Sequence, residues 1–112
     1  NIDGEYIDAQ LYQRSGDMFL GVPFNITSYA FLLSIIGHIT GYKPRKLIHI
    51  LGNSHIYEEH LDSIMKQLNR VPYKFPTLKI NNQLTDIDSI KEEYFEVCNY
   101  NSYGPIKPPM IT

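Results

Sequence analysis

Residues 24–41, FNITSYAFLLSIIGHITG, decide the fold of this chain. Apolar side chains cover nearly the whole circumference of a helix drawn over residues 24–40, and Gly41 is suited to end it. Pro23 fits the first turn of such a helix and favours an extended conformation at Val22. A helix that is apolar on all sides has to be buried on all sides, so the sequence predicts a buried apolar helix.

The length of the chain conflicts with that burial. The sequence has 112 residues, which indicates one domain at most, and a chain of this size buries only roughly 60–70% of the surface that its unfolded form exposes. We therefore expect further chain or a partner subunit to complete the core. Polar groups within the apolar stretch (Pro23, Asn25, Ser34, His38) argue against a membrane span.

Other segments surround the helix with a mixture of strands and helices. The patterns predict strands over residues 5–12, 47–51, 77–80 and 94–98, and helices over residues 60–69 and 86–93. A turn is expected at residues 3–4, a break in the pattern over residues 14–21, a basic loop at residues 43–46 and an extended tail over residues 104–109. This alternation predicts an α+β fold.

Composition excludes several classes of protein. Ten basic and 12 acidic residues give a net charge of -2, so nucleic-acid binding is not expected. One cysteine, Cys98, allows no intrachain disulfide and fits a small core residue in a reducing, cytoplasmic protein. His49, His55 and His60 lack further ligands for a metal, so no metal site is predicted. The first residues lack the regions of a signal peptide and resemble the middle of a protein.

Residues 14–17 combine a guanidinium, a hydroxyl and a glycine backbone at the end of a predicted strand. Arg14, Ser15, Gly16 and Asp17 supply the charged and neutral donors that suit a phosphate monoester. The alternative is a polar turn whose arginine forms a surface ion pair.

Asn25 is an amide at the start of an apolar helix. Its oxygen accepts and its nitrogen donates, which matches the N3–H donor and O4 acceptor of uracil. A cytosine edge is better matched by a carboxyl group. The alternative role for Asn25 is an N-terminal cap of the helix.

His55 and Tyr57 lie two positions apart, with Ile56 between them. In an extended segment such residues project to the same side, so the imidazole and the phenol can bind one sugar hydroxyl. The alternative is a pair of half-buried aromatic rings with water as their partner.

Three separated motifs carry a resemblance to a known family. QRSGDMFLGVPFN at residues 13–25, LGNSHIY at residues 51–57 and FPTLKI at residues 75–80 occur in the order and spacing of the C-terminal part of thymidylate synthase. The resemblance extends from about Gln10 to Thr112. It implies an α+β fold in which a large mixed sheet packs against the buried helix, and in which the sheets of two subunits stack in a homodimer.

The resemblance also implies a reaction and roles for named residues. The reaction is the reductive methylation of dUMP to dTMP with 5,10-methylenetetrahydrofolate. The catalytic residues implied are Arg14, Asp17 and Asn25. The residues implied for dUMP are Gln13, Arg14 and Ser15 at the phosphate, Asp17 and Asn25 at the pyrimidine, and His55 and Tyr57 at the ribose, together with Gly16 and Ile56. The residues implied for the folate are Asp17, Leu20, Gly21 and Phe24, with Ile111 and Thr112 in the closing tail.

Two parts of the family pattern are missing or changed in these 112 residues. The nucleophile of the family lies in a Pro-Cys-His motif upstream of the first strand, and Cys98 does not match that motif. The arginines that a partner subunit adds to the phosphate site are also expected elsewhere. Ile111-Thr112 departs from the small or aliphatic ending usual in the family. The segment alone is therefore expected to be inactive.

Three identities compete for the sequence. The first is the C-terminal part of an active synthase, which can also be fused to a dihydrofolate reductase. The second is a noncatalytic nucleotide-binding, folate-binding or dimerisation module with the same fold. The third is a relative of dCMP hydroxymethylase, which Asn25 disfavours because it matches uracil.

Overall fold

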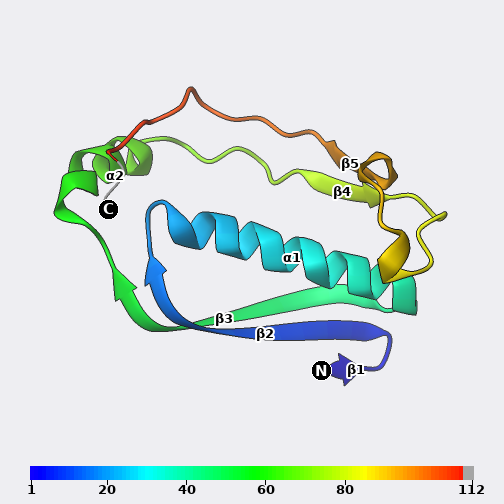
Figure 1. The fold of residues 1–112 in the computed structure, drawn as a ribbon. Helices are drawn as coiled ribbons and strands as arrows, with labels where there is room; N and C mark the ends of the chain where they lie inside the picture. The colour runs from blue at the N-terminus through cyan, green and yellow to red at the C-terminus, as the bar shows by residue number, and fades with distance from the viewer. Residues whose placement is uncertain (110–112) are drawn as a thin grey trace.

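The computed structural model describes residues 1–109. Three layers are visible in Figure 1: a sheet, the long helix α1 above it, and a small hairpin with the C-terminal segment above the helix. The elements in chain order are β1 (Ile2–Asp3), β2 (Tyr6–Asp17), α1 (Gly21–Thr40), β3 (Lys43–His55), η1 (Glu58–His60), α2 (Leu61–Leu68), β4 (Thr77–Ile80), η2 (Ile87–Ser89), η3 (Glu92–Tyr94) and β5 (Phe95–Cys98). This mixture of elements confirms the α+β class.

The first sheet has the order β1-β2-β3 and is mixed. β1 is antiparallel to β2, whereas β2 and β3 are parallel and are joined through α1. Parallel neighbours need such a crossover, and the helix it contains covers one face of the sheet. The register ends with Asp17 opposite His55, so both strands finish at the same edge.

Both long strands extend further than the sequence patterns predict. The expected break at residues 14–21 is wrong up to Asp17, because Gly16 is buried in β2 and serves close packing rather than a turn. A Cβ at Gly16 would lie 2.8 Å from Leu51 Cδ2 and 2.9 Å from Val22 Cγ2. The expected basic loop is likewise strand, and Arg45 forms an ion pair of 2.7 Å with Asp8 of β2.

Helix α1 begins at Gly21, three residues earlier than predicted. Val22 is helical and not extended, and Pro23 occupies the third helical position. Proline is tolerated there because the first four backbone N–H groups of a helix have no partner within it. Gly41 ends the helix as predicted, with a left-handed φ of 78°.

Helix α1 is buried along one side only in this chain. Val22, Leu33, Ile35 and Gly37 are buried, whereas Phe24 is 74% exposed. Residues 1–109 by themselves therefore do not bury α1 on all sides, and the prediction is wrong for this part of the chain. By length and composition, α1 could also cross a membrane, with a mean hydropathy of 1.4. Its buried side packs on β2 and β3, as in a crossover helix.

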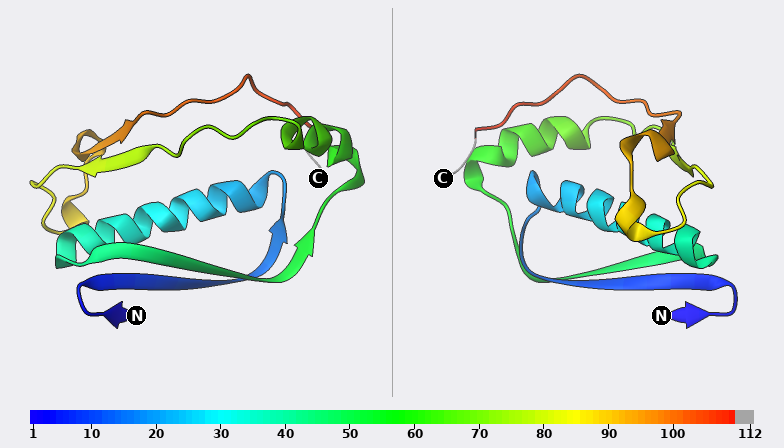
Figure 2. Two further views of the ribbon diagram at one scale, coloured as in Figure 1. Left: turned by 180° about the vertical axis from the view of Figure 1, so that it is seen from behind. Right: turned by 45° about the vertical axis from the view of Figure 1, so that its right-hand side comes forward.

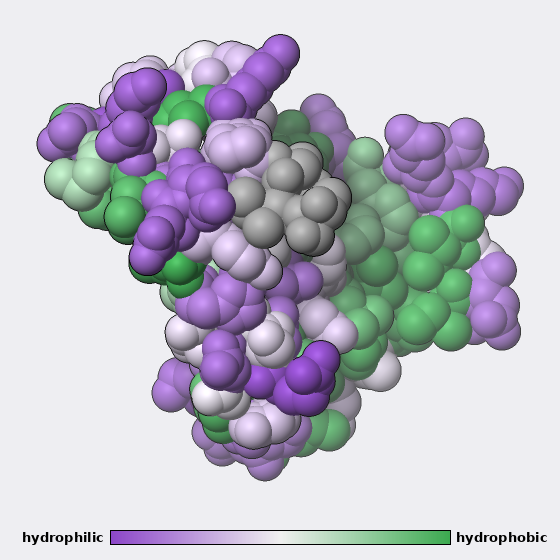
Figure 3. Space-filling model, turned by 60° about the vertical axis from the view of Figure 1, so that its left-hand side comes forward, coloured by the Kyte–Doolittle hydropathy of each residue, from purple (hydrophilic) through white to green (hydrophobic). Residues whose placement is uncertain are grey.

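The chain exposes far more surface than a compact protein of its size. Its accessible surface is 8649 Å², against about 6,300 Å² for a folded monomer of this mass. Its radius of gyration is 16.5 Å, against about 13 Å. Figure 3 shows a broad hydrophobic area on one face, flanked by hydrophilic side chains. Exposed apolar areas of this breadth are typical of surfaces that contact other molecules.

The second half of the chain packs above α1. Strands β4 and β5 are antiparallel, and the ring of Phe95 of β5 contacts that of Phe31 of α1 at a tilt of 57°, with centroids 4.8 Å apart. Two 3₁₀ helices replace the single helix predicted for residues 86–93, and Asp86 caps the first of them. From β5 the extended C-terminal segment returns above α1 to α2 (Figures 1 and 2).

Candidate functional site

The candidate site lies where the parallel strands β2 and β3 end and α1 begins. Asp17 lies opposite His55 in the register, and the next backbone N–H, that of Met18, donates to the carbonyl of His55 at 2.9 Å. In open α/β units, ligands bind at the carboxyl ends of such strands. The sequence motifs at residues 13–25 and 51–57 are therefore brought together at one edge.

Gln13 is the centre of a series of hydrogen bonds at this edge of the sheet. His49 Nε2 lies 2.9 Å from Gln13 Oε1, so this ring nitrogen carries the proton and donates. Gln13 Nε2 then donates to the carbonyl of Ser15 at 2.9 Å and to Asn25 Oδ1 at 3.0 Å. One imidazole proton therefore fixes the orientation of two amides.

The contact with Gln13 sets the orientation of the Asn25 amide. The alternative role as a helix cap is wrong, because Leu20 occupies the N-cap position and no side chain bonds there. Asn25 Oδ1 accepts from Gln13 Nε2, and within residues 1–109 its second lone pair and the two Nδ2 hydrogens have no hydrogen-bond partner. This is the donor and acceptor pair that a uracil edge requires.

Arg14 and Ser15 lie next to Gln13 near the end of β2. Arg14 is exposed, and within residues 1–109 no carboxylate pairs with it, so the predicted alternative of a surface ion pair is not found. Ser15 is half-buried and accepts from Gln13 through its backbone carbonyl. The two side chains share an edge of the sheet without a hydrogen bond between them.

Asp17 shapes the turn between β2 and α1. Its Oδ1 accepts from the backbone N–H of Phe19 at 3.0 Å, which holds residues 17–19 in a tight turn. Gly21 is the first residue of α1, and a Cβ at that position would lie 3.5 Å from Asp17 Cβ. The carboxylate is therefore held against the start of the helix.

His55 and Tyr57 project together, as the sequence predicts. Their rings meet edge to face with centroids 5.3 Å apart. His55 Nδ1 lies 3.1 Å from Asn53 Oδ1, so Nδ1 donates and Nε2 is left as an acceptor. Ile56 between them is 50% exposed. An imidazole acceptor beside a phenol suits a hydroxyl ligand.

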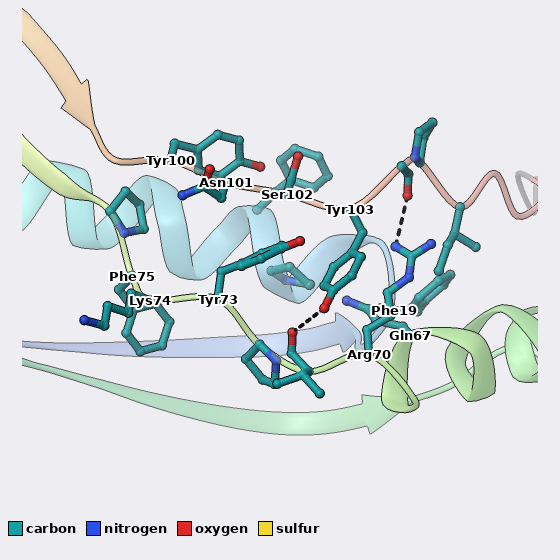
Figure 4. A pocket seen from close by; sticks show the side chains of 18 of the residues that line it. Phe19, Gln67, Arg70, Tyr73, Lys74, Phe75, Tyr100, Asn101, Ser102 and Tyr103 are labelled. Atoms are coloured by element: carbon teal, nitrogen blue, oxygen red, sulfur yellow. Dashed lines mark hydrogen bonds between the residues drawn. The ribbon is translucent and has the colours of Figure 1, made fainter.

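An aromatic cleft of about 650 Å³ opens beside the start of α1. One side of the cleft is lined by Phe19, Leu20, Pro23 and Phe24, and the other side by residues 70–76 and 100–106. Figure 4 shows Tyr73 and Tyr103 facing each other in this cleft, with ring centroids 4.7 Å apart. Its flat apolar walls fit an aromatic ring. The predicted tail residues Ile111 and Thr112 lie outside the described residues.

Two histidines that the sequence reasoning left without a function take part in this region. His49 lies in the strand predicted over residues 47–51, and its hydrogen bond orients Gln13. His60 is 1% exposed and hydrogen-bonded to the C-terminal segment. The sequence does offer one signal for a function of His49, because it is the single polar residue within the apolar run of residues 47–51. Within residues 1–109 no three potential ligand residues are grouped for a metal, and Cys98 is half-buried at the end of β5.

Comparisons with known proteins agree on one family. The sequence model of thymidylate synthase matches residues 1–112. The thymidylate synthases of Homo sapiens and of varicella-zoster virus (strain Dumas) are 51% and 49% identical over 104 residues, which are 93% of this chain and 33% and 35% of those proteins. That of Phytoplasma mali is 46% identical over 106 residues, 95% of this chain and 37% of the relative.

The chain thus spans about a third of the length of these relatives. The match covers every motif that forms the edge described above, from Gln13 to Tyr57. The chain belongs to the thymidylate synthase family.

Proposed function

We propose that the protein carrying this chain converts dUMP to dTMP, using 5,10-methylenetetrahydrofolate as the donor of both the one-carbon unit and the hydride. The observation that carries the proposal is the fixed amide of Asn25. His49 and Gln13 hold its oxygen side in place, which leaves one acceptor and one donor aligned for a pyrimidine edge. Uracil supplies the complementary N3–H and O4, whereas cytosine does not.

The other parts of dUMP have partners at the same edge. Arg14, an exposed cation without a carboxylate partner within residues 1–109, would bind the 5′-phosphate together with Ser15 and the Gln13 backbone region. His55 Nε2 and the Tyr57 hydroxyl would hold the ribose 3′-hydroxyl. Asp17 and Gly16 would present backbone groups to the pyrimidine.

The folate would occupy the aromatic cleft beside α1. Leu20 and Phe24 lie on its wall, and the 74% exposure of Phe24 leaves a whole ring face for a flat ligand. Gly21 keeps the backbone close to Asp17, which would contact the pterin. When bound, the folate supplies the carbon and the reducing equivalent, while these residues orient it and exclude water. Ile111 and Thr112 would complete the closure.

The remaining machinery would come from outside the 112 residues. We place the nucleophilic cysteine in the N-terminal part of one synthase domain, of which residues 1–112 form the C-terminal part. A fixed cation such as Arg14 would favour the thiolate form of that cysteine. A homodimer partner would add arginines at the phosphate, with the sheets of two subunits stacked, in a cytoplasmic protein.

Tritium release tests the proposal directly. The natural protein that carries this chain is incubated with [5-³H]dUMP and methylenetetrahydrofolate, and both tritium release and dTMP are measured. Equal release and dTMP formation are expected, and R14A should abolish both by weakening phosphate binding. Binding of dUMP without release would instead favour a noncatalytic binding module, and turnover of dCMP alone would favour a hydroxymethylase.

A further inference from the structure

Asn53 is an exposed amide on β3, two residues before His55. Its Oδ1 lies 3.1 Å from His55 Nδ1, and these two side chains form no other hydrogen bond within residues 1–109. An amide oxygen only accepts, so Nδ1 carries the proton and donates. Since a neutral imidazole has one N–H, Nε2 keeps a lone pair. Asn53 thus decides which ring nitrogen of His55 is left as an acceptor for a ligand.

The surroundings of His55 hold its ring in place. The backbone N–H of Met18 donates to the carbonyl of His55 at 2.9 Å. The rings of His55 and Tyr57 meet edge to face at 83°, and Tyr57 also contacts the ring of the buried His60, with centroids 5.5 Å apart. The imidazole and the phenol are therefore fixed relative to each other, and Asn53 sets the position of the proton on the imidazole.

The position of that proton determines which groups the ring can bind. A lone pair on Nε2 needs a donor, and a ribose 3′-hydroxyl supplies one. The oxygen of the same hydroxyl can then accept from the Tyr57 phenol. A 3′-oxygen that carries a phosphate or another substituent has no proton to donate, so its lone pairs would face the lone pair of Nε2. Acceptors left unpaired in this way weaken binding.

The charges along this part of the chain act in the same direction. Residues 47–65 contain no lysine or arginine, and glutamates occupy both positions 58 and 59. Asp17 lies opposite His55 in the register of β2 and β3. The segment that carries His55 therefore offers no cation to a phosphate on the 3′-oxygen, and its carboxylates repel one.

We propose that Asn53 is a positioning residue that holds His55 in the Nδ1–H form, and that the site therefore selects nucleotides with a free 3′-hydroxyl. The inference rests on the proposed function, because it takes the ligand to be dUMP with its ribose at His55 and Tyr57. It adds a substrate class to that function. Mononucleotides are accepted, whereas nucleotides with a 3′-phosphate, including those within a nucleic-acid strand, are rejected.

Two substitutions of similar size test the role of Asn53 in the natural protein. N53D replaces the amide with a carboxylate, which only accepts and therefore keeps Nδ1 as the donor. N53L has nearly the same shape and offers no acceptor. Because Asn53 is exposed, both variants are expected to fold, and a thermal melt checks this.

The nitrogen-15 spectrum of histidine-labelled protein reports which ring nitrogen of His55 carries the proton. It is recorded without ligands at about pH 9, where an imidazole is neutral, and the His55 signal is identified by its loss in H55Q. Wild type and N53D should show the Nδ1–H form. In N53L the ratio of the Nδ1–H form to the Nε2–H form should fall roughly 5- to 10-fold, as expected for the loss of one hydrogen bond.

The affinities for three nucleotides test the selection at the same pH. The nucleotides are dUMP, its 3′-deoxy-3′-fluoro analogue, which cannot donate, and deoxyuridine 3′,5′-bisphosphate. Wild type and N53D should bind dUMP roughly 5- to 10-fold more tightly than the fluoro analogue, and the bisphosphate more weakly still. In N53L the preference for dUMP over the fluoro analogue should shrink roughly threefold or more, because Nε2 can then carry the proton. The Kd for dUMP itself should change little, since a hydroxyl also accepts.

The outcomes separate this inference from the proposed function. A proton on Nε2 in the wild type, or an unchanged ratio of the two forms in N53L, would overturn the role of Asn53 even if turnover is normal. Equal affinity of the wild type for dUMP and the bisphosphate would overturn the selection. An Nδ1–H form that is lost in N53L, in a protein that neither binds nor converts dUMP, would retain the contact of Asn53 with His55, and would refute the proposed function and the selection with it.

Discussion

Two regions of the unit formed by β2, α1 and β3 differ in how far residues of this chain supply their contacts. At the carboxyl edge, Gln13 uses its oxygen and its nitrogen in three hydrogen bonds, all within this chain. Along α1 beyond the site, Ile26, Tyr29 and Leu32 are 45%, 42% and 39% exposed. The geometry of the site is therefore set locally, whereas residues 1–109 leave much of the apolar surface of α1 without cover.

The largest effect is expected when residues 1–112 are produced alone. Each large apolar side chain left in water forgoes about 1.5–3 kcal/mol of burial, while a whole domain is stable by only about 5–15 kcal/mol. We expect no cooperative thermal transition by circular dichroism, strong binding of a hydrophobic dye, and no turnover of dUMP. A monodisperse monomer with a sharp transition would show that the exposed face needs no cover.

A smaller effect is expected at the contact between the end of α1 and β3. A Cβ at Gly37 would lie 2.6 Å from Pro44 Cγ and 2.8 Å from the carbonyl oxygen of Tyr42. G37A should therefore destabilise the natural protein by about 1–3 kcal/mol in urea unfolding, although alanine favours a helix by about 1 kcal/mol.

Gly104 provides the matched control for Gly37, since a Cβ there meets nothing within 4 Å. G104A should leave the urea midpoint nearly unchanged. Stabilisation by G37A would mean that helix propensity outweighs the contact, and that α1 and β3 are less closely packed than described.

The next prediction tests the hydrogen bonds that link His49, Gln13 and Asn25. H49F removes the donor to Gln13 Oε1 and so frees the amide that orients Asn25. We expect kcat/KM for dUMP to fall about 10-fold, which corresponds to one lost hydrogen bond. H49Q, whose amide nitrogen can replace Nε2, should retain most of the activity. Equal losses in both variants would assign His49 to packing alone.

The smallest effect concerns acid stability at the far end of the same strands. The Arg45 guanidinium donates to Asp8 and holds the pKa of that carboxyl below its usual 3.8. A lowered pKa stabilises the fold above pH 3.8 and the contribution is lost as pH falls below that value. In D8N the free energy of unfolding, measured with urea at several pH values between 5 and 2, should therefore fall less steeply as the pH is lowered.

The more exposed pair of Glu5 and Lys43 is the control for Asp8. E5Q should change the acid limb less than D8N. An unchanged limb in D8N would mean that the Arg45 contact contributes nothing measurable in solution.

The sequence predicted what depends on local pattern and missed what depends on close packing. Strands β4 and β5, the end of α1 at Gly41 and the shared side of His55 and Tyr57 follow from alternation, turn chemistry and spacing. The sequence pattern predicts a break at Gly16, because the close contact with Leu51 that requires a glycine there depends on tertiary structure. The exposed flank of α1 and the link from His49 to Asn25 depend on tertiary neighbours, which periodicity does not identify.

The most direct test of the account is the pyrimidine preference of Asn25 variants in the natural protein. N25D is compared with wild type by measuring kcat/KM for tritium release from [5-³H]dUMP and from [5-³H]dCMP. If the fixed amide reads uracil, N25D should lose dUMP turnover and gain relative preference for dCMP, because a carboxyl group can match the cytosine edge. Unchanged selectivity would contradict the claim that the edge formed by Gln13 and Asn25 recognises the base.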